Sequence, residues 1–371
     1  MKLSIITINY NNAEGLRKTL ASVAAQTYTN IEHIIVDGGS TDGSVEVIEA
    51  YASGVACTAS GCGIKDAVSA ADAAVNSQPA KGAQLREATQ PANGTLPAHS
   101  AHHQILWVSE PDKGIYNAMN KGLEIALGKR IVNDDHTSSP LASRLSPDSL
   151  SEYIQILNSG DILAAPDVTE RMMAALAQQG KESSKAETDA SSPLASRLSP
   201  IQNRPAIFYG NMIKEYPDGR CVKDTCGSAD YTPESFLYFY KGTLNHDCAY
   251  IRRDLFEKYG LYNEQMKICS DWEWYVRAIV LGGEKTVYTN IDVTIFDMTG
   301  ISESGGKNKE LILNERREYL ESILPAAVLR DYDKYAFPIS QYQRLKKYHL
   351  WGIVYFMERV LFKFEKWFNK G

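Results

Sequence analysis

Short apolar runs alternate with helix-like periods along most of the chain. Apolar runs of strand length lie at Leu3–Ile8, Ile31–Val36, Ile105–Val108 and Tyr153–Leu157. Between them, apolar residues recur at the spacing of amphipathic helices over Ala13–Ala25, Ser44–Tyr51 and Ile115–Leu127. This alternation of strand and helix predicts an α/β fold with a mostly parallel, Rossmann-like sheet and helices on both faces.

Polar residues follow each predicted strand directly. They are Asn9-Tyr10-Asn11, Asp37, Glu110–Asp112 and Asp161, in the order of the strands. The carboxyl ends of parallel strands meet at one edge of a sheet, and ligands of open α/β sheets bind at that edge. We therefore expect one site that gathers these residues.

Three segments interrupt the pattern, at about 52–104, 131–151 and 178–204. None contains Phe, Trp or Tyr. Such segments bury too little apolar surface to offset their ordering entropy, so we expect flexible surface insertions. The last two share the decamer Ser-Ser-Pro-Leu-Ala-Ser-Arg-Leu-Ser-Pro, at Ser138–Pro147 and Ser191–Pro200. We interpret it as an element copied into two loops, with a docking motif as the alternative.

Composition limits the classes of protein that fit. The 371 residues are 44% hydrophobic and 23% charged with a net charge of −6, which favours a soluble globular protein over a nucleic-acid binder. The start of the chain has no pattern of a secretory signal, and no apolar run of about 18 residues occurs. We therefore expect a cytoplasmic protein. Its six cysteines lack the C-x2-C spacing of zinc sites, so we expect reduced thiols.

Two common nucleotide motifs are absent. No G-x-G-x-x-G follows the first strand, and no G-x-x-x-x-G-K-[ST] occurs anywhere. A nucleotide ligand would therefore be held by carboxylates and an aromatic ring. At the strand ends, Tyr10 is placed to stack on a base and Asp37 to accept a hydrogen bond from a base N–H.

Four motifs, in the same order along the chain, resemble those of family 2 glycosyltransferases. They are Ser4–Asn12 with Ala25–Tyr28 and Ile34–Gly43, then Ser109–Gly122, then Ile156–Asp161, and finally Ser270–Trp274. The resemblance covers about 1–51, 105–130, 152–177 and 205–303. It implies the GT-A fold, an inverting glycosyl transfer and a catalytic domain over 1–303, followed by a helical C-terminal extension over 304–371.

The resemblance also implies a role for individual residues. The positions that match Asp37 and Asp112 bind the nucleotide in the family. With the neighbouring motif residues, the implied nucleotide site is Thr7, Asn9, Tyr10, Asp37, Asp112 and Lys113. For Asp37 the alternative is turn chemistry, because Asp37–Gly43 is also a good loop sequence.

Asp161 lies at the position of the family's metal motif. The family often carries two acidic residues there, whereas this chain has only Asp161, after Asn158 and Gly160. One carboxylate suffices for Mg²⁺ or Mn²⁺ on a nucleotide, because phosphate oxygens and water supply the remaining ligands. The alternative is a loop aspartate ahead of a helix over Pro166–Ala177.

Asp271 matches the family's catalytic base. A single displacement needs one carboxylate to take the proton of the acceptor hydroxyl, because the diphosphate leaves with help from the metal. Asp271 lies in the first turn of a predicted helix, Cys269–Leu281, while Glu273 points to another face. The alternative is a carboxylate that only stabilises the start of the helix. Asn158, His246 and Glu273 are weaker candidates for contacts with the acceptor or the phosphates, His246 lying just ahead of a predicted strand, Cys248–Ile251.

The C-terminal tail, 344–371, differs from the rest of the chain. It carries seven Lys and Arg against two Glu, and large apolar residues from Leu350 to Phe368 recur at helical spacing opposite the basic ones. This pattern is typical of helices that lie in a membrane interface. A packed C-terminal helix is the alternative. The interfacial interpretation predicts a protein on the inner face of the cell membrane.

These observations predict an enzyme that transfers a sugar from a nucleotide diphosphate donor, UDP-sugar first, to a hydroxyl of a glycan or polyprenyl-diphosphate-linked acceptor in polysaccharide assembly. A sugar-phosphate nucleotidyltransferase would need a basic Gly-rich loop where this chain has Asn9–Gly15. The other alternative is a degenerate family member that acts as a scaffold in a polysaccharide-assembly complex.

Overall fold

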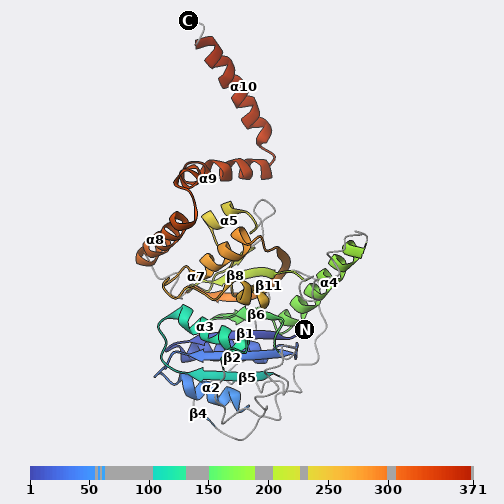
Figure 1. The fold of residues 1–371 in the computed structure, drawn as a ribbon, viewed down its shortest axis with the longest axis vertical. Helices are drawn as coiled ribbons and strands as arrows, with labels where there is room; N and C mark the ends of the chain where they lie inside the picture. The colour runs from blue at the N-terminus through green and yellow to red at the C-terminus, as the bar shows by residue number, and fades with distance from the viewer. Residues whose placement is uncertain are drawn as a thin grey trace.

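The computed structural model describes residues 1–54, 57–58, 61–62, 103–130, 150–188, 204–225, 233–298 and 306–368. Its helices cover both faces of one central sheet, and three further helices extend from it towards the C-terminus (Figure 1). The predicted α/β architecture with a mostly parallel sheet is confirmed, because strands and helices alternate through the first half of the chain as expected.

Nine strands form the central sheet, in the order β5-β2-β1-β6-β10-β8-β11-β7, with β9 paired to β8. The strands are β1 (Leu3–Asn9), β2 (Ile31–Asp37), β5 (Gln104–Ser109), β6 (Tyr153–Ile156), β7 (Ile162–Leu163), β8 (Ile207–Glu215), β9 (Cys221–Asp224), β10 (Ala249–Arg252) and β11 (Thr286–Asp297). A separate hairpin joins β3 (Cys57–Thr58) and β4 (Gly61–Cys62).

The strand directions bring distant segments to one edge. Strands β5, β2, β1 and β6 are parallel, so their carboxyl ends meet. Strand β10 runs antiparallel to β6 and to β8, and therefore begins where β6 ends. We call this side of the sheet the carboxyl edge. Residues just ahead of β10 consequently join those that follow β1, β2 and β6.

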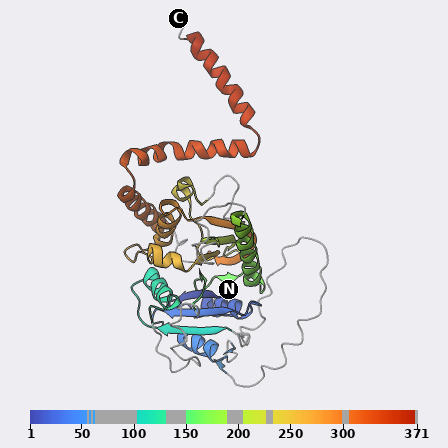
Figure 2. The ribbon, with the colours of Figure 1, turned by 45° about the vertical axis from the view of Figure 1, so that its right-hand side comes forward.

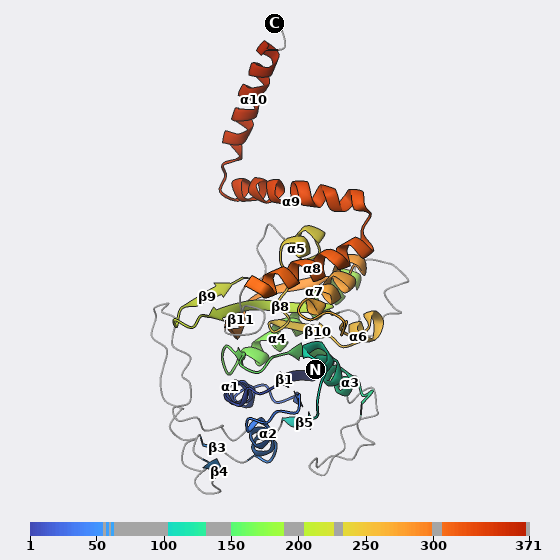
Figure 3. The ribbon, with the colours of Figure 1, turned by 90° about the vertical axis from the view of Figure 1, so that its left-hand side faces the viewer.

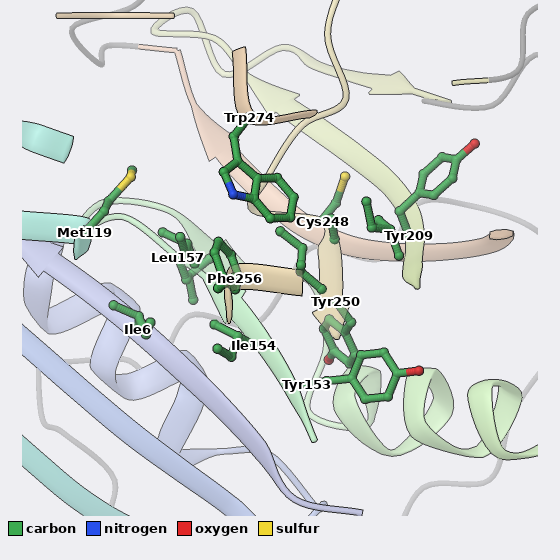
Figure 4. Close-up of a cluster of buried hydrophobic side chains, with 14 of the residues drawn as sticks. Ile6, Met119, Tyr153, Ile154, Leu157, Tyr209, Cys248, Tyr250, Phe256 and Trp274 are labelled. Carbon is green, nitrogen blue, oxygen red and sulfur yellow. The ribbon is translucent and has the colours of Figure 1, made fainter. Parts of the chain in front are cut away.

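Helices bury the central strands from both sides, which explains why β1 and β2 are buried along their whole length. Helices α1 (Ala13–Ala24) and α2 (Ser44–Ala52) pack on one face through Leu16, Leu20, Ile35 and Ile48. Helix α3 (Ile115–Ala126) packs on β1 and β2 from the other face. Figure 4 shows the larger core, where Phe256 and Trp274 lie beside Leu157 and Met119.

The second half adds α4 (Val168–Thr188), α5 (Phe236–Lys241), α6 (Asp254–Tyr259) and α7 (Ser270–Tyr275). A π-helical turn, Val276–Leu281, continues α7, so the predicted helix over Cys269–Leu281 is present with a change of pitch. Helix α4 extends into the segment 178–204, whose beginning we expected to be flexible. Lack of aromatics does not break a helix, and the Gln, Lys, Glu and Ala residues there are strong helix formers.

Most of the remaining expected insertions, 55–56, 59–60, 63–102, 131–149 and 189–203, lie outside the described residues, as do both copies of the repeated decamer. Within the described part, Cys221, Cys248 and Cys269 are free thiols.

Three helices follow the sheet: α8 (Gly306–Ile323), α9 (Ala326–Lys347) and α10 (Trp351–Phe368). Figures 1 and 2 show α10 standing away from the body of the protein. Every side chain of α10 is partly or fully exposed. Among the described helices, none combines the length and the apolar character needed to cross a bilayer.

The packing of α3 on the sheet depends on a missing side chain. A Cβ added to Gly122 would lie 2.4 Å from Cγ2 of Ile6, so the helix approaches β1 more closely than any larger residue allows. We expect Gly122→Ala to lower the free energy of unfolding by about 1–3 kcal/mol through overpacking. Chemical denaturation measures this. Gly352→Ala is the matched control, since nothing lies within 4 Å of its added Cβ, and an equal loss in both would contradict the explanation.

Candidate functional site

The loops after β1 and β2 are tied together at the carboxyl edge. The backbone N–H of Asn11 donates to Oγ of Ser40 at 2.8 Å, and the N–H of Thr41 donates to Oδ1 of Asn11 at 2.9 Å. Asn11 adopts a positive φ of 47°, which asparagine tolerates better than most residues. The two loops therefore form one surface.

Asp37 is buried beneath that surface and is fully hydrogen-bonded. Its carboxylate accepts from the side chains of Asn9, Ser40 and Ser109 and from the backbone N–H groups of Gly39 and Ser40, at 2.5–3.1 Å. Burial raises the pKa of Asp37, but these hydrogen bonds outweigh burial and lower it. Since both oxygens already accept several bonds, Asp37 shapes the loop and holds Asn9.

Tyr10 and Asp112 lie on the outside of the same loop. Tyr10 is 65% exposed, although it is a large aromatic at a strand end. A Cβ on Gly38 would lie 2.4 Å from Oδ2 of Asp112 and 3.0 Å from Cδ2 of Tyr10. The missing side chain of Gly38 therefore lets the Tyr10 ring and a carboxylate oxygen of Asp112 both approach the same point of the backbone. Oδ1 of Asp112 accepts from the N–H of Gly114 at 2.8 Å, and no described residue donates to Oδ2.

Two other sequence candidates lie apart from this pair. Thr7 is fully buried and its hydroxyl contacts Nε2 of His33 at 2.9 Å inside the fold. Lys113 is exposed at the start of α3, where its backbone N–H donates to Asn117. The structure thus brings Asn9, Tyr10, Asp37 and Asp112 together and places Thr7 one layer deeper.

The turn Asn158–Asp161 adjoins this surface. Asn12 donates from Nδ2 to the carbonyl of Ser159 at 3.1 Å, which links the β1 loop to the turn. Thr19 of α1 donates to the carbonyl of Asp161 at 2.8 Å. The carboxylate of Asp161 is almost buried and accepts from the backbone N–H of Asp297 at 3.1 Å. Oδ1 of Asn158 is a buried acceptor without a partner in the described part of the chain.

Negative charge accumulates around Asp161. Burial raises the pKa of Asp161 well above its ordinary value, and the charges of Asp247 and Asp297 raise it further. Asp247, at the start of β10, is also buried, which raises its pKa, and it accepts from Thr294 at 3.2 Å. The turn is therefore a buried acidic place that a cation would stabilise.

Asp271 and His246 form an ion pair beside this cluster. Nδ1 of His246 lies 3.4 Å from Oδ2 of Asp271, and Tyr116 donates to Oδ1 of Asp271 at 2.9 Å. Burial raises the pKa of Asp271, but the His246 contact and the Tyr116 hydrogen bond outweigh it, so the pKa is lowered. Burial lowers the pKa of His246, but Asp271, Asp247 and Asp161 raise it to about 9. Asp271 is therefore ionised at neutral pH.

His246 also contacts the turn Asn158–Asp161. Its Nε2 lies 3.2 Å from the side-chain amide of Asn158, whose oxygen is the atom that a protonated imidazole can donate to, so one imidazole bridges the Asp271 and Asn158 segments. Glu273 takes no part in this bridge, because it pairs with Arg277 at 2.9 Å on another face of α7. Two residues apart on a helix, Asp271 and Glu273 separate as expected.

Sequence reasoning gave no role to Tyr116, Asp297 or Glu315. Tyr116 lies inside the motif Ser109–Gly122. The available signal was its position one helical turn before Asn120, a residue that also contacts the segment ahead of α7, at the carbonyl of Tyr262. Asp297 and Glu315 have no local signal, because their contacts with Asp161 and with 267–269 span more than 40 residues.

The chain is similar in sequence to known glycosyltransferases. Residues 4–65 match the family model "Glycosyl transferase family 2". The chain is 26% identical over 300 residues to an uncharacterized glycosyltransferase of Mycobacterium tuberculosis, a match that covers 81% of this chain and 76% of the relative. A PGL/p-HBAD biosynthesis glycosyltransferase of Mycobacterium bovis is 20% identical over 312 residues, covering 84% and 81%.

Residues 4–65 thus match the family that the motifs indicated, and both relatives are named glycosyltransferases. Among solved structures, TarS of S. aureus in complex with UDP-GlcNAc aligns with a TM-score of 0.48 at 15% identity, covering 88% of this chain and 69% of that one. The mannosyltransferase PcManGT of Pyrobaculum calidifontis, with GDP-Man and Mn²⁺, aligns with a TM-score of 0.40 at 15% identity, covering 80% and 56%.

Stability should depend on pH through His246. Although burial opposes it, Asp271 raises the pKa of His246 from 6.5 to about 9, so the pair contributes fully below pH 6.5 and its contribution is lost as the pH rises through 9. At 1.36 kcal/mol per pKa unit, the contribution is at most about 3 kcal/mol. Urea unfolding at pH 6.5 and 9.5 should show a larger loss for the wild type than for His246→Gln. Equal losses in the two proteins would contradict the pairing.

Proposed function

We propose that this protein transfers a sugar from a nucleotide diphosphate donor to a hydroxyl group with inversion at the anomeric carbon. The observation that carries the proposal is the ionised Asp271 carboxylate, held by His246 and Tyr116 in the acidic cluster at the edge that also presents Tyr10 and Asp112. A single displacement requires a general base close to a surface that binds the nucleotide donor, and these residues would supply both.

The reaction needs few protein groups. The acceptor oxygen forms a bond to the anomeric carbon while the bond from that carbon to the diphosphate breaks, and Asp271 takes the hydroxyl proton. The lowered pKa of Asp271, maintained against burial by His246 and Tyr116, keeps it unprotonated at neutral pH. His246 retains its own proton at that pH and holds Asp271 in place.

The donor nucleotide would lie on the surface made by the β1 and β2 loops. The exposed ring of Tyr10 provides a stacking face, and Oδ2 of Asp112 is the acceptor available for a base or ribose group. Asp37 supports this surface from below. We expect UDP as the nucleotide, because the single ring of a pyrimidine would stack on Tyr10 and its ring N–H would donate to Oδ2 of Asp112.

The residues of the Asn158–Asp161 turn fit a divalent cation bound together with the diphosphate. Asp161 is a hard oxygen ligand whose pKa is raised by burial and by neighbouring carboxylates, as expected for a place that lacks a positive charge. No cluster of three or more His, Cys, Asp or Glu among the described residues could hold a metal by itself. Phosphate oxygens and water would complete the shell of Mg²⁺ or Mn²⁺, and the ion would neutralise charge on the leaving diphosphate.

The alternative is a degenerate member that acts as a scaffold. The protein's own contacts favour the enzyme, because a site without function has no need for an ionised, almost buried Asp271 next to a charged imidazole. Binding of nucleotide separates the two.

Calorimetric titration with UDP, GDP and dTDP, each with and without Mn²⁺, tests the proposal. We expect metal-dependent UDP binding that Asp161→Asn weakens at least about tenfold and that Tyr10→Ala weakens by about 1–3 kcal/mol through lost stacking. Tyr10→Phe keeps the ring and should bind normally. Selective binding of another nucleotide would change the donor, and failure of all three would favour the scaffold.

We further propose that the acceptor is a lipid-linked glycan and that α10 holds the enzyme on the inner face of the cell membrane. Nine large apolar side chains of α10 are more than half exposed: Ile353, Tyr355, Phe356, Met357, Leu361, Phe362, Phe364, Trp367 and Phe368. Arg359, Lys363 and Lys366 form a basic row on the helix of an otherwise acidic protein. Exposed aromatics next to a basic row are complementary to an anionic bilayer surface.

Vesicle flotation tests this attachment. We expect the full chain to float with vesicles that contain anionic lipid, and a chain that ends at His349 to stay in solution. Lys363→Glu with Lys366→Glu should weaken binding to anionic vesicles by about 1 kcal/mol per charge. The same pattern of flotation for the full and shortened chains would refute the attachment, and a concentration-dependent dimer lost with α10 would assign the helix to self-association.

A further inference from the structure

Helix α8 of the C-terminal extension is hydrogen-bonded to the segment just ahead of Asp271. The carboxylate of Glu315 accepts from three consecutive backbone N–H groups: Lys267 at 2.6 Å, Ile268 at 3.1 Å and Cys269 at 3.0 Å. These residues lie immediately ahead of α7, where backbone N–H groups lack partners within the helix. One side chain thus fixes the backbone two to four residues before Asp271.

The same face of α8 makes the neighbouring contacts. Cys269 donates from Sγ to the carbonyl of Ile312 at 3.7 Å, the guanidinium of Arg316 lies 5.0 Å from the ring centre of Trp272, and Tyr319 meets Trp272 edge-on at 5.8 Å. Ile312, Glu315, Arg316 and Tyr319 follow the spacing of one helix face. Figure 3 shows α8 lying along α7. The extension is therefore packed directly on α7, the helix that carries Asp271 in its first turn.

The opposite side of the segment is held by α3. The Tyr116 hydroxyl lies 2.5 Å from the carbonyl oxygen of Ile268 and 2.9 Å from Oδ1 of Asp271, and its one proton is shared between these two acceptors. Tyr116 therefore contacts the same residue whose N–H donates to Glu315. The backbone of Ile268 is consequently held on both sides. Helix α8 binds its N–H, and helix α3 binds its C=O. Loss of either contact frees Asp271 to move relative to His246.

We infer that Glu315 is a positioning residue that sets the geometry of the Asp271–His246 pair. This inference rests on the proposed role of Asp271 as base, and it assigns the C-terminal extension a part in the chemistry. A carboxylate suits the task because its two oxygens accept three bonds, whereas glutamine offers one acceptor oxygen. If Glu315 only anchored α8, its loss would affect stability and leave the pair unchanged.

The titration of His246 by NMR, on the full chain in metal-free buffer, separates these roles. Asp271, Asp247 and Asp161 are the charged groups that face the ring, and the signal is assigned with His246→Gln. We expect Asp271→Asn to lower the pKa of His246 by about 1–3 units, and Glu315→Gln to lower it by part of that amount. Asp271→Asn with Glu315→Gln should show no further shift beyond Asp271→Asn, because the second change acts through Asp271.

Glu318→Gln is the matched control, an exposed residue of the same helix that loses the same charge. It should leave the titration unchanged. A wild-type titration in Glu315→Gln, with only the melting temperature lowered, would overturn the inference. Release of nucleoside diphosphate from UDP-glucose, GDP-glucose and dTDP-glucose gives the second readout, in which Glu315→Gln should lose about 10–100-fold in turnover with nucleotide affinity unchanged. Full turnover in Asp271→Asn would instead refute the proposed base.

Discussion

Buried carboxylates are the constraint on which the site depends. Removing a charged carboxylate from water costs several kcal/mol unless partners compensate it. This protein buries Asp37, Asp161 and Asp247 almost completely and Asp271 largely. Five hydrogen bonds hold Asp37 ionised, and an imidazolium with a tyrosine does the same for Asp271. Asp161 has weaker compensation, so burial and the charge of Asp247 raise its pKa well above the ordinary value, and a cation would suit it.

This division explains how similar aspartates take on different tasks. The carboxylate of Asp37 accepts hydrogen bonds from its own loop and from Ser109, and this loop in turn carries Gly38, against which Tyr10 and Asp112 lie. Asp271 keeps its charge through two side chains from other elements, His246 ahead of β10 and Tyr116 in α3. The first arrangement is local and rigid. The second depends on how the sheet, α3 and α8 are packed together.

The sequence predicts the local features well because they depend on period and spacing. The runs Leu3–Ile8 and Ile31–Val36 become β1 and β2, and Asp271 lies in the first turn of a helix with Glu273 turned away, as expected. The pairing of His246 with Asp271 could not be read from the sequence, since it requires β10 to run against β6. Helix α4 extends beyond the predicted helix over Pro166–Ala177, because the Gln, Lys, Glu and Ala residues that follow favour a helix even without aromatics. The three bonds of Glu315 depend on the docking of α8, for which no periodic signal exists.

The direction of the strands also determines where an insertion lies relative to the site. The connections from α2 to β5, from α3 to β6 and from α4 to β8 all run from the end of a helix to the start of a strand, and these strands share one direction through β1, β2 and β10. Their starts therefore lie on the side of the sheet away from Asp161 and Asp271. An insertion in one of these connections would therefore leave the spacing of the residues at the carboxyl edge unchanged.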